Sequence, residues 1–416
     1  MSNEVTRIQL KKQGGPWMGR ILFSKATTAT LLLFITSLLA DSPAWSFERH
    51  AHHHNHAVHS HTATDDRSDD ESAMSSFDHP LFSGSLNPAE AAKAQKEFIS
   101  EYQAARSKHH STVQVYKKYL PLLGSDRISN YFEEKNPSCH GVLHNMGKAV
   151  AQLEPNLIQA VGICSDACTY ACVHGAIKTI YADRVASGKA SVASVQQELA
   201  DLCQQPPVIP DFFEGNCAHA AGHAFGILGK ERLSQAISLC SAFSNPEMHF
   251  YCEGGVYMQL MSQLNRALLA AKPKNRSAAI RSRMNFCYHA GQNMSACMRF
   301  VMHRFRKIAD LNIIRKYCQA RNGSARLSCF NGLGFLARGK ILDGSLSLES
   351  LCPSDEALEK QCISGFAFVK KGYKNRERIA AACRSLGRSS SRRYCMDQYH
   401  GYLYQIGNPT LAEMSG

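Results

Sequence analysis

Two short motifs place pairs of histidines at a spacing that suits a metal ion. The motifs read CHGVLHNMG at residues 139–147 and CAHAAGHAFG at residues 217–226. In each motif two histidines are four residues apart, so on a helix they share one face with their Cβ atoms about 5–6 Å apart. Two such pairs supply the four imidazoles that a divalent transition metal accepts. We therefore expect a metal site formed by His140, His144, His219 and His223.

Other histidines follow a cysteine at a similar place. They are His174 after Cys172, His289 after Cys287 and His400 after Cys395. If equivalent helices stack, these first-turn positions form a row, and the positive end of each helix keeps imidazole neutral and able to bind a metal. The sequence therefore adds His174 and His289 to the expected ligands. Glu214 and Glu253 are candidate carboxylate partners.

A histidine-rich segment lies between the N-terminus and these motifs. It contains His50, His52, His53, His54, His56, His59 and His61, and an acidic patch follows it. No helical or strand period runs through residues 47–86, which predicts a linker without a core of its own. Tracts of this kind bind Zn, Cu or Ni loosely and raise the local metal concentration. The linker could equally be a plain solvated one.

The chemistry that accompanies the histidines remains open on sequence alone. Neither pair encloses the glutamate of a His-Glu-x-x-His protease, and the chain has no Walker loop, nucleophile elbow or dinucleotide fingerprint. The motifs therefore favour metal binding or delivery over catalysis. Two alternatives remain: an interaction scaffold in which the histidines are structural, and a metal-dependent enzyme that uses the same residues.

The sixteen cysteines recur in pairs along the chain. Seven pairs can be read: Cys164 with Cys172, Cys203 with Cys217, Cys240 with Cys252, Cys287 with Cys297, Cys318 with Cys329, Cys352 with Cys362, and Cys383 with Cys395. Cys139 and Cys168 are left over and could form an eighth disulfide or, as thiolates, join a metal site. Spacing alone does not fix this connectivity.

The second cysteines of the pairs are 32 to 45 residues apart, the period of two-helix repeats. We expect one helix of each repeat to begin at the second cysteine and another to end on the next first cysteine. Glycines three residues after the second cysteine, such as Gly175 and Gly255, indicate close packing of neighbouring helices. The prediction is an all-α chain, an αα-repeat solenoid over residues 87–416 with disulfides linking successive helices, whose first helix follows the cap residue Asn87.

This layout resembles the secreted cysteine-rich proteins with Sel1-like repeats, in which two cysteines per αα unit bridge the helices. The segment CQARNGSARLSCFNGLG at residues 318–334 carries the resemblance best. The resemblance extends over residues 164–407 and implies a concave binding scaffold. It brings no catalytic residues with it.

The N-terminus has the features of an export signal. Basic residues precede an uncharged stretch at residues 26–40, and a small-x-small site follows at residues 44–46. The stretch is shorter than the roughly 20 apolar residues that span a bilayer, which favours a cleaved signal over residues 1–46 and a mature chain without a transmembrane span. Export to the periplasm or medium also suits a chain rich in disulfides.

The charge is concentrated in the C-terminal part. Residues 265–416 carry 26 Lys and Arg against nine Asp and Glu. Two clusters stand out, Lys370, Lys371, Lys374, Arg376 and Arg378, and then Arg384, Arg388, Arg392 and Arg393. Such clusters attract anionic partners, and outside the cytoplasm we expect an unknown protein or an anionic surface ahead of nucleic acid. A solvated basic face without a partner is the alternative.

Overall fold

The structure is a computed structural model. It describes residues 86–135, 139–204, 214–229, 232–270, 278, 280–281, 284, 287, 294–302, 310–368, 375–401 and 406–415, with side chains omitted for 262–270. These residues form helices and turns without a strand, so the all-α prediction is confirmed for them. They belong to one compact unit, residues 71–416. Within it, none of the described helices combines the length and apolar character needed to cross a membrane.

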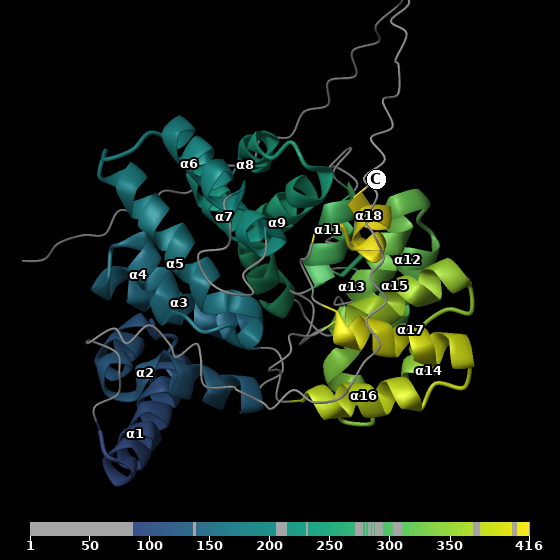
Figure 1. Ribbon diagram of the computed structural model, residues 1–416, viewed down its shortest axis with the longest axis horizontal. Coiled ribbons are helices and arrows are strands. Elements are labelled where there is room, and N and C mark those ends of the chain that lie inside the picture. The colour runs from purple at the N-terminus through teal and green to yellow at the C-terminus, as the bar shows by residue number, and fades with distance from the viewer. Residues whose placement is uncertain are drawn as a thin grey trace, which may run out of the picture. The chain divides into compact units, whose positions relative to one another are not determined.

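Figure 1 labels the described helices in chain order. They are α1 (Pro88–Ser107), α2 (Val113–Lys135), α3 (His140–Leu153), α4 (Leu157–Ile163), α5 (Ala167–Ala186), α6 (Val192–Gln204), α7 (Glu214–Leu228), α8 (Leu233–Ser238), the 3-10 helix η1 (Leu239–Ala242), α9 (Pro246–Ala270), α11 (Met294–Val301), α12 (Leu311–Gln319), α13 (Gly323–Leu342), α14 (Leu348–Leu351), α15 (Glu356–Ala367), α16 (Arg376–Arg384), α17 (Ser389–His400) and α18 (Pro409–Ser415).

The first helix begins where the sequence places its cap. The Asn87 side chain accepts hydrogen bonds from the backbone N–H groups of Ala89 and Glu90, and the Glu90 carboxylate accepts one from Asn87 N–H. This reciprocal capping satisfies donors that a helix start otherwise leaves unpaired. Helix α2 consists of two helical segments joined across a bend at Gly124, which adopts a φ of 72°.

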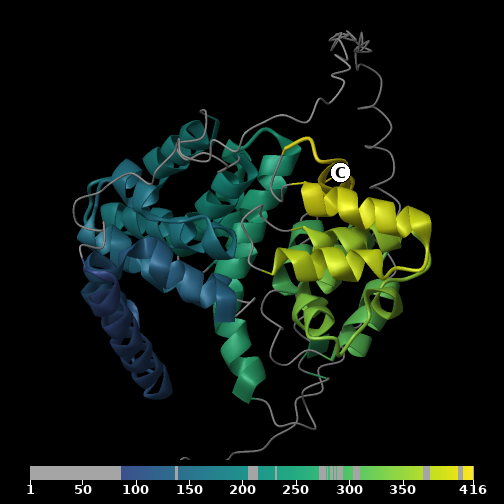
Figure 2. The same ribbon diagram turned by 60° about the horizontal axis from the view of Figure 1, so that its bottom comes forward.

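A row of helices, each packed against the next, forms the centre of this unit. The row helices are α3, α5, α7, α9, α11, α13, α15 and α17. Connecting helices precede or follow them in sequence and pack on them, namely α4, α6, α8, α12, α14 and α16. The C-terminal helix α18 contacts α9, α11, α13 and α15, and Figure 2 shows it beside one end of α9.

Eight disulfides staple this arrangement, and they are the seven pairs that the spacing favoured together with a bond between the two remaining cysteines. They join Cys139–Cys168, Cys164–Cys172, Cys203–Cys217, Cys240–Cys252, Cys287–Cys297, Cys318–Cys329, Cys352–Cys362 and Cys383–Cys395. Where a connecting helix is described, its last turn or cap carries the first cysteine of a pair, as with Cys318 in α12 and Cys383 in α16. Each of these bonds therefore fixes the end of one helix to the next row helix.

One detail of the predicted repeat is wrong. The row helices begin three to six residues before the second cysteine, as with Pro246 before Cys252 and Glu356 before Cys362. The caps explain this difference, because Asn245 and Asp355 accept hydrogen bonds from backbone N–H groups of the first turn. The second cysteine consequently lies inside the helix, and its disulfide holds the second turn.

Neighbouring row helices touch backbone to backbone through glycine. A Cβ atom on Gly175 of α5 would overlap the carbonyl oxygen of His144 in α3, and one on Gly147 of α3 would overlap that of Cys172. The same reciprocal contact joins α7 to α9 through Gly222 and Gly255, and α13 to α15 through Gly334 and Gly365. The glycines were expected to serve packing, and the structure supplies the reason.

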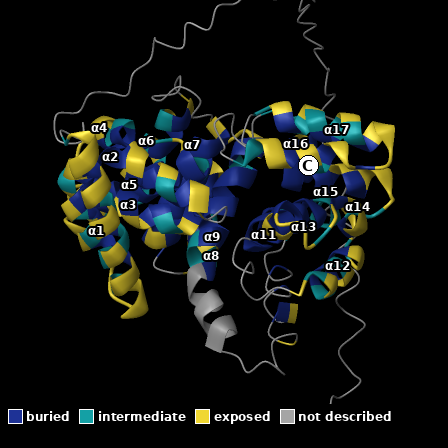
Figure 3. Ribbon diagram, turned by 90° about the horizontal axis from the view of Figure 1, so that it is seen from below, coloured by how far each residue is buried: buried dark blue, intermediate teal, exposed yellow. Residues whose placement is uncertain are grey.

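Helix α7 is buried on all sides. All of its described residues from Gly215 to Gly226 are buried, whereas α1 has an exposed outer side (Figure 3). Its many alanines and glycines fit between α5 and α9, since small side chains let both neighbours approach closely. Any polar side chain on α7 is therefore placed inside the protein.

Candidate metal centre

Three successive row helices bring five histidines together. Helix α3 supplies His140 and His144, α5 supplies His174, and α7 supplies His219 and His223. The glycine contacts between α3 and α5 bring these backbones close enough for imidazoles of both helices to meet. The sequence motifs therefore predicted a real cluster, and His174 belongs to it as expected from its place after Cys172.

Four of the five histidines have the geometry of a ligand set. One nitrogen of each of His140, His144, His174 and His223 lies within 4.8 Å of the corresponding atom of every other. The ring centroids are 4.7 Å apart for His140 and His144, 4.7 Å for His144 and His223, and 5.6 Å for His174 and His223. A Zn–N bond is about 2.0–2.1 Å long, so these nitrogens need only small side-chain shifts to converge on one ion.

The pairing within the cluster differs from the one that the motifs suggest. His219 was expected among the four ligands, yet the group includes His174 in its place. By position in the repeat, His144 of α3 corresponds to His219 of α7, because each lies three residues before the glycine that meets the next helix. The two motifs are therefore offset by one helical turn.

His219 lies at the border of the group. Its ring centroid is 5.1 Å from that of His174 and 4.9 Å from that of His223. On another side it faces the ring of Phe300, whose centroid is 5.0 Å away. The Nδ1 atom of His219 donates a hydrogen bond of 3.1 Å to the carbonyl oxygen of Tyr251 in α9. This bond and the ring contact hold His219 beside the four candidate ligands.

Burial keeps these imidazoles in the neutral form that binds metals. Removal from water lowers the pKa of His144, His174 and His223 well below the usual value, and the charge of nearby Lys178 acts in the same direction. Burial lowers the pKa of His219 to about 3. The sequence reasoning assigned this role to helix starts, but only His140 lies in a first turn. Burial, rather than the helix dipole, is the dominant cause.

Hydrogen bonds define the tautomers on one side of the cluster. The Nδ1 atom of His140 donates to the carbonyl oxygen of Cys168 at 2.8 Å. In a neutral ring Nε2 of His140 then carries a lone pair, and it lies 3.1 Å from Nε2 of His144, which donates to it. Binding of one metal ion by both Nε2 atoms would require His144 to change tautomer, so that its proton lies on Nδ1 and its Nε2 is free to bind.

The deepest histidines carry the clearest signal for a ligand. Both ring nitrogens of His174 and both of His223 are buried without a hydrogen-bond partner among the residues that the structure describes. Both side chains are 0% exposed. Burial of a polar group without a partner costs roughly 1–3 kcal/mol, and structures rarely retain such groups without a reason. Coordination of a metal would give these nitrogens a partner.

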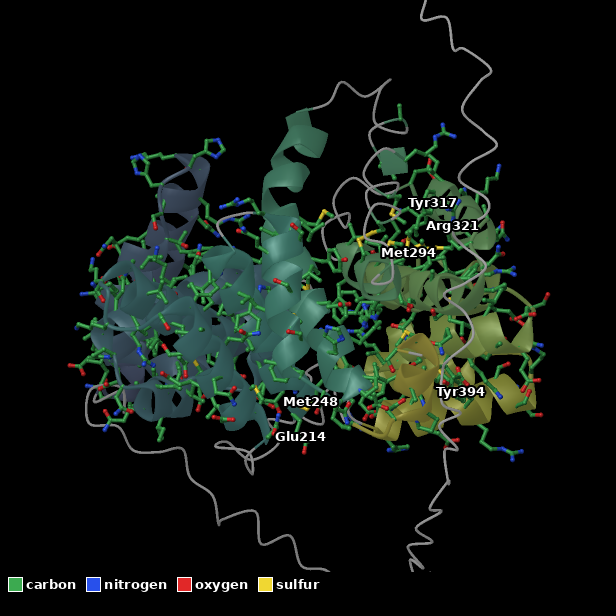
Figure 4. The ribbon with its side chains drawn as sticks, turned by 90° about the horizontal axis from the view of Figure 1, so that it is seen from above. Glu214, Met248, Met294, Tyr317, Arg321 and Tyr394 are labelled. Atoms are coloured by element: carbon green, nitrogen blue, oxygen red, sulfur yellow. A yellow bond between two sulfur atoms is a disulfide. The ribbon has the colours of Figure 1, made fainter. Side chains whose placement is uncertain are left out.

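The two candidate carboxylates lie apart from this group. Oε1 of Glu253 lies 3.4 Å from Nε2 of His249, and burial raises the pKa of Glu253 to about 8. Glu214 is exposed at the start of α7, and Figure 4 shows it near Met248 at the edge of the structure in that view. The four-histidine group contains neither residue. The expectation of a carboxylate partner therefore gains no support from these two glutamates.

The predicted row of histidines does not extend along the stack. His400 is exposed at the end of α17 and is not in the four-histidine group. His289 and the histidine-rich tail at residues 50–61 lie outside the described residues, so their roles as ligands stay predictions. Cys139 and Cys168 form a disulfide, and the idea that either acts as a thiolate ligand is therefore wrong.

The arginines of the basic C-terminal face mostly contact their own chain. Arg376 donates to the carbonyl oxygen of Tyr399, Arg392 to that of Leu386, and Arg388 pairs with the Glu359 carboxylate. Lys370, Lys371 and Lys374 lie outside the described residues. The described members of the face thus have structural contacts, and an anionic partner for it stays a prediction.

Two features near the histidines were missed by sequence reasoning. Phe300 occupies the position three residues after Cys297 where other repeats have glycine, and its ring packs over Gly254 and beside His219. The turn at Cys168 also escaped notice, although it holds His140. The signals were present in the sequence, since Phe300 departs from the glycine pattern and Cys168 from the regular cysteine pairs.

Comparison with known proteins does not assign this site to a family. Searches of protein-family models, of curated proteins and of solved structures each found no match to the chain. The resemblance to Sel1-like repeat proteins therefore stays a prediction, and the function is argued from the geometry of the site.

Proposed function

We propose that this chain is an exported αα-solenoid that binds a transition metal through His140, His144, His174 and His223. The observation that carries the proposal is a group of four imidazoles whose nitrogens lie within 4.8 Å of one another, three of them buried with a lowered pKa. The nitrogens of His174 and His223, which have no hydrogen-bond partner among the described residues, support it further. A stack of helices stapled by eight disulfides suits a rigid site in an oxidising compartment.

The ligand set restricts the class of metal. Imidazole nitrogen suits Zn, Cu and Ni, whereas Mg and Ca prefer oxygen. Four neutral imidazoles also leave the charge of the ion uncompensated, which favours ions that form strong bonds to nitrogen. We therefore expect Zn, Cu or Ni, bound once per chain.

The histidine-rich segment fits a role in delivery. Its seven histidines at residues 50–61 are exchangeable ligands that would collect metal at low affinity. The cluster would then hold one ion at higher affinity, because its four nitrogens are already gathered on three packed helices. The histidine-rich segment then raises the rate at which metal reaches the protein, and the cluster determines the equilibrium affinity for the metal.

A titration with Zn²⁺ against a chromophoric chelator tests the proposal. We expect one tight site per chain, and a loss of affinity of at least 100-fold in a His174→Ala/His223→Ala variant, because half of the ligand set is removed. His249→Ala and His400→Ala are matched controls, since neither residue belongs to the four-histidine group. Equal affinity in the double variant and the controls would refute the assignment of these ligands.

A further inference from the structure

The peptide unit of Cys168 is held from three directions. Its N–H group donates to Oε1 of Glu133 at 2.8 Å, and its carbonyl oxygen accepts from Nδ1 of His140 at 2.8 Å. Its sulfur is bonded to Cys139, the residue directly before His140. Cys168 is therefore linked to His140 in two ways, through its disulfide to the preceding residue Cys139 and through the hydrogen bond that its carbonyl oxygen accepts.

The backbone at this point has an unfavourable conformation. Cys168, Thr169 and Tyr170 have φ values of 54°, 61° and 54°, which is the left-handed region. For residues with a side chain this region costs roughly 1–2 kcal/mol each, so it persists only where the surroundings impose it. Here the disulfide and the Glu133 bond are the contacts that hold the turn.

His140 is also the candidate ligand closest to solvent. It is 9% exposed, whereas His174 and His223 are 0% exposed. Packing alone fixes the buried rings, but a ring at the edge of the cluster depends more on a second contact for its orientation. Metal-binding histidines are usually oriented by a hydrogen bond at their other ring nitrogen. The Cys168 carbonyl provides that bond and leaves Nε2 facing the cluster.

We propose that the Cys139–Cys168 disulfide is a positioning element of the metal site, which holds the Cys168 carbonyl against His140 and so presents Nε2 of His140 to the ion. This inference rests on the proposed function. It assigns a role in metal affinity to two cysteines that do not themselves contact the ion.

The connectivity of this disulfide sets it apart from the others. It spans 29 residues and links the start of α3 directly to α5, two helices that carry three of the four candidate ligands. The other seven span 8 to 14 residues. Cys352–Cys362, for example, ties the short helix α14 to the row helix α15. A disulfide of that kind links successive helices of the repeat, and its removal provides a control for the general effect of losing a disulfide.

A double-mutant cycle separates positioning from general stability. We expect Cys139→Ser/Cys168→Ser to weaken Zn²⁺ binding about 10- to 100-fold, the range for loss of an orienting contact. Cys352→Ser/Cys362→Ser should leave the affinity within about twofold while also removing one disulfide. In a His140→Ala background the Cys139/Cys168 change should have little further effect, because its target is already absent.

A spectroscopic measurement provides a readout that stability alone does not change. In the Cu²⁺-loaded protein, the electron paramagnetic resonance spectrum reports the coordinating nitrogens. The Cys139→Ser/Cys168→Ser variant should give a spectrum close to that of His140→Ala. Should this variant fail to fold, Glu133→Gln keeps the disulfide and weakens the bond to Cys168 N–H, and it should shift the spectrum in the same direction.

The outcomes distinguish the inference from the proposed function. If the unmodified protein binds neither Zn²⁺ nor Cu²⁺ at the cluster, the proposed function fails and the inference with it. If the unmodified protein binds Zn²⁺ but the two disulfide variants lose affinity equally, the inference alone is overturned. A further full loss in the His140→Ala background would overturn it as well, since the disulfide would then act elsewhere.

Discussion

Gly175 of α5 lies directly against the main-chain carbonyl of His144 in α3, and a Cβ at Gly175 would overlap that oxygen atom. The contact leaves no room for a side chain and brings the two helix backbones together. Because His144 and His174 stand on either side of it, the distance between their imidazoles depends on this glycine. Their ring centroids are 5.9 Å apart.

Gly175→Ala should therefore damage both the fold and the site. The added methyl group must push α3 and α5 apart, and overpacking of this kind costs about 1–3 kcal/mol. Chemical denaturation should show that loss, and Zn²⁺ titration should show weaker binding. Gly141→Ala in α3 is the control, because no atom outside its own helix surroundings lies within 4 Å of the new Cβ. It should be neutral or stabilise α3 by up to about 1 kcal/mol. Equal effects at both glycines would contradict this explanation.

His174→Leu should separate a ligand from a structural histidine. Leucine has a similar volume and no polar atoms, so in the metal-free protein it removes two buried nitrogens that lack a partner among the described residues. We expect the free energy of unfolding to stay equal or to rise by about 1–3 kcal/mol, while Zn²⁺ binding is lost. Metal-free protein should be compared by denaturant unfolding. A loss of stability above about 1 kcal/mol would favour a histidine that serves the fold.

The stability of the metal-free protein should depend on pH below neutrality. Burial lowers the pKa values of His144, His174, His219 and His223 in the folded state, so the unfolded chain binds more protons once the pH falls below about 6.5. The free energy of unfolding should therefore decrease as the pH falls from about 6.5 towards 5. Each fully buried histidine contributes a slope of about 1.4 kcal/mol per pH unit. Denaturation at several pH values should give a smaller slope for His174→Leu/His223→Leu.

Glu253 should give the opposite dependence on the alkaline side. Burial raises its pKa to about 8, so the folded state holds a proton that the unfolded chain loses above its ordinary pKa. Its contribution to stability is present at low pH and decreases as the pH rises towards 8. Together with the histidines this predicts maximal stability near pH 6.5. Glu253→Gln should flatten the decline between pH 6.5 and 8, and an unchanged decline would exclude Glu253 as its source.

Phe300 and Gly254 should behave as a coupled pair. A Cβ on Gly254 would overlap the Phe300 ring, which also packs beside His219. Phe300→Ala should cost about 3–5 kcal/mol through the cavity it leaves, and Gly254→Ala should also destabilise by overpacking. In the Phe300→Ala background the Gly254→Ala change should become nearly neutral, because the space is then free. Additive losses in denaturant unfolding would show that the two residues do not share this space.

The sequence predicted which helices and disulfides form better than it predicted the residue at which each helix begins. The cysteine spacing indicated alternating helices and seven of the eight disulfides, because cysteines that recur at the period of two-helix repeats are typical of bonds between successive helices. The helix starts were placed late, since caps such as Asn245 and Asp355 lie upstream of the cysteines. A cysteine marks a contact between helices and does not mark where a helix begins.

The sequence predicted which histidines belong to the cluster but did not predict which four of them lie closest together. Histidines four apart share a helix face, so His140 with His144 and His219 with His223 were within reach of sequence reasoning. The exchange of His219 for His174 in the ligand group depends on how α7 packs along α5. That register is a property of packing between helices. The left-handed turn at Cys168 has the same origin.

The most direct measurement is the metal content of protein purified without an affinity tag from its native compartment. Three chains should be compared by elemental analysis: the unmodified chain, one with the seven tail histidines at residues 50–61 changed to asparagine, and one with His174→Leu/His223→Leu. We predict about one equivalent of Zn, Cu or Ni in the first two and none retained by the third after dialysis. Metal that disappears with the tail histidines, or that remains in the third chain, would contradict a metal site at the histidine cluster.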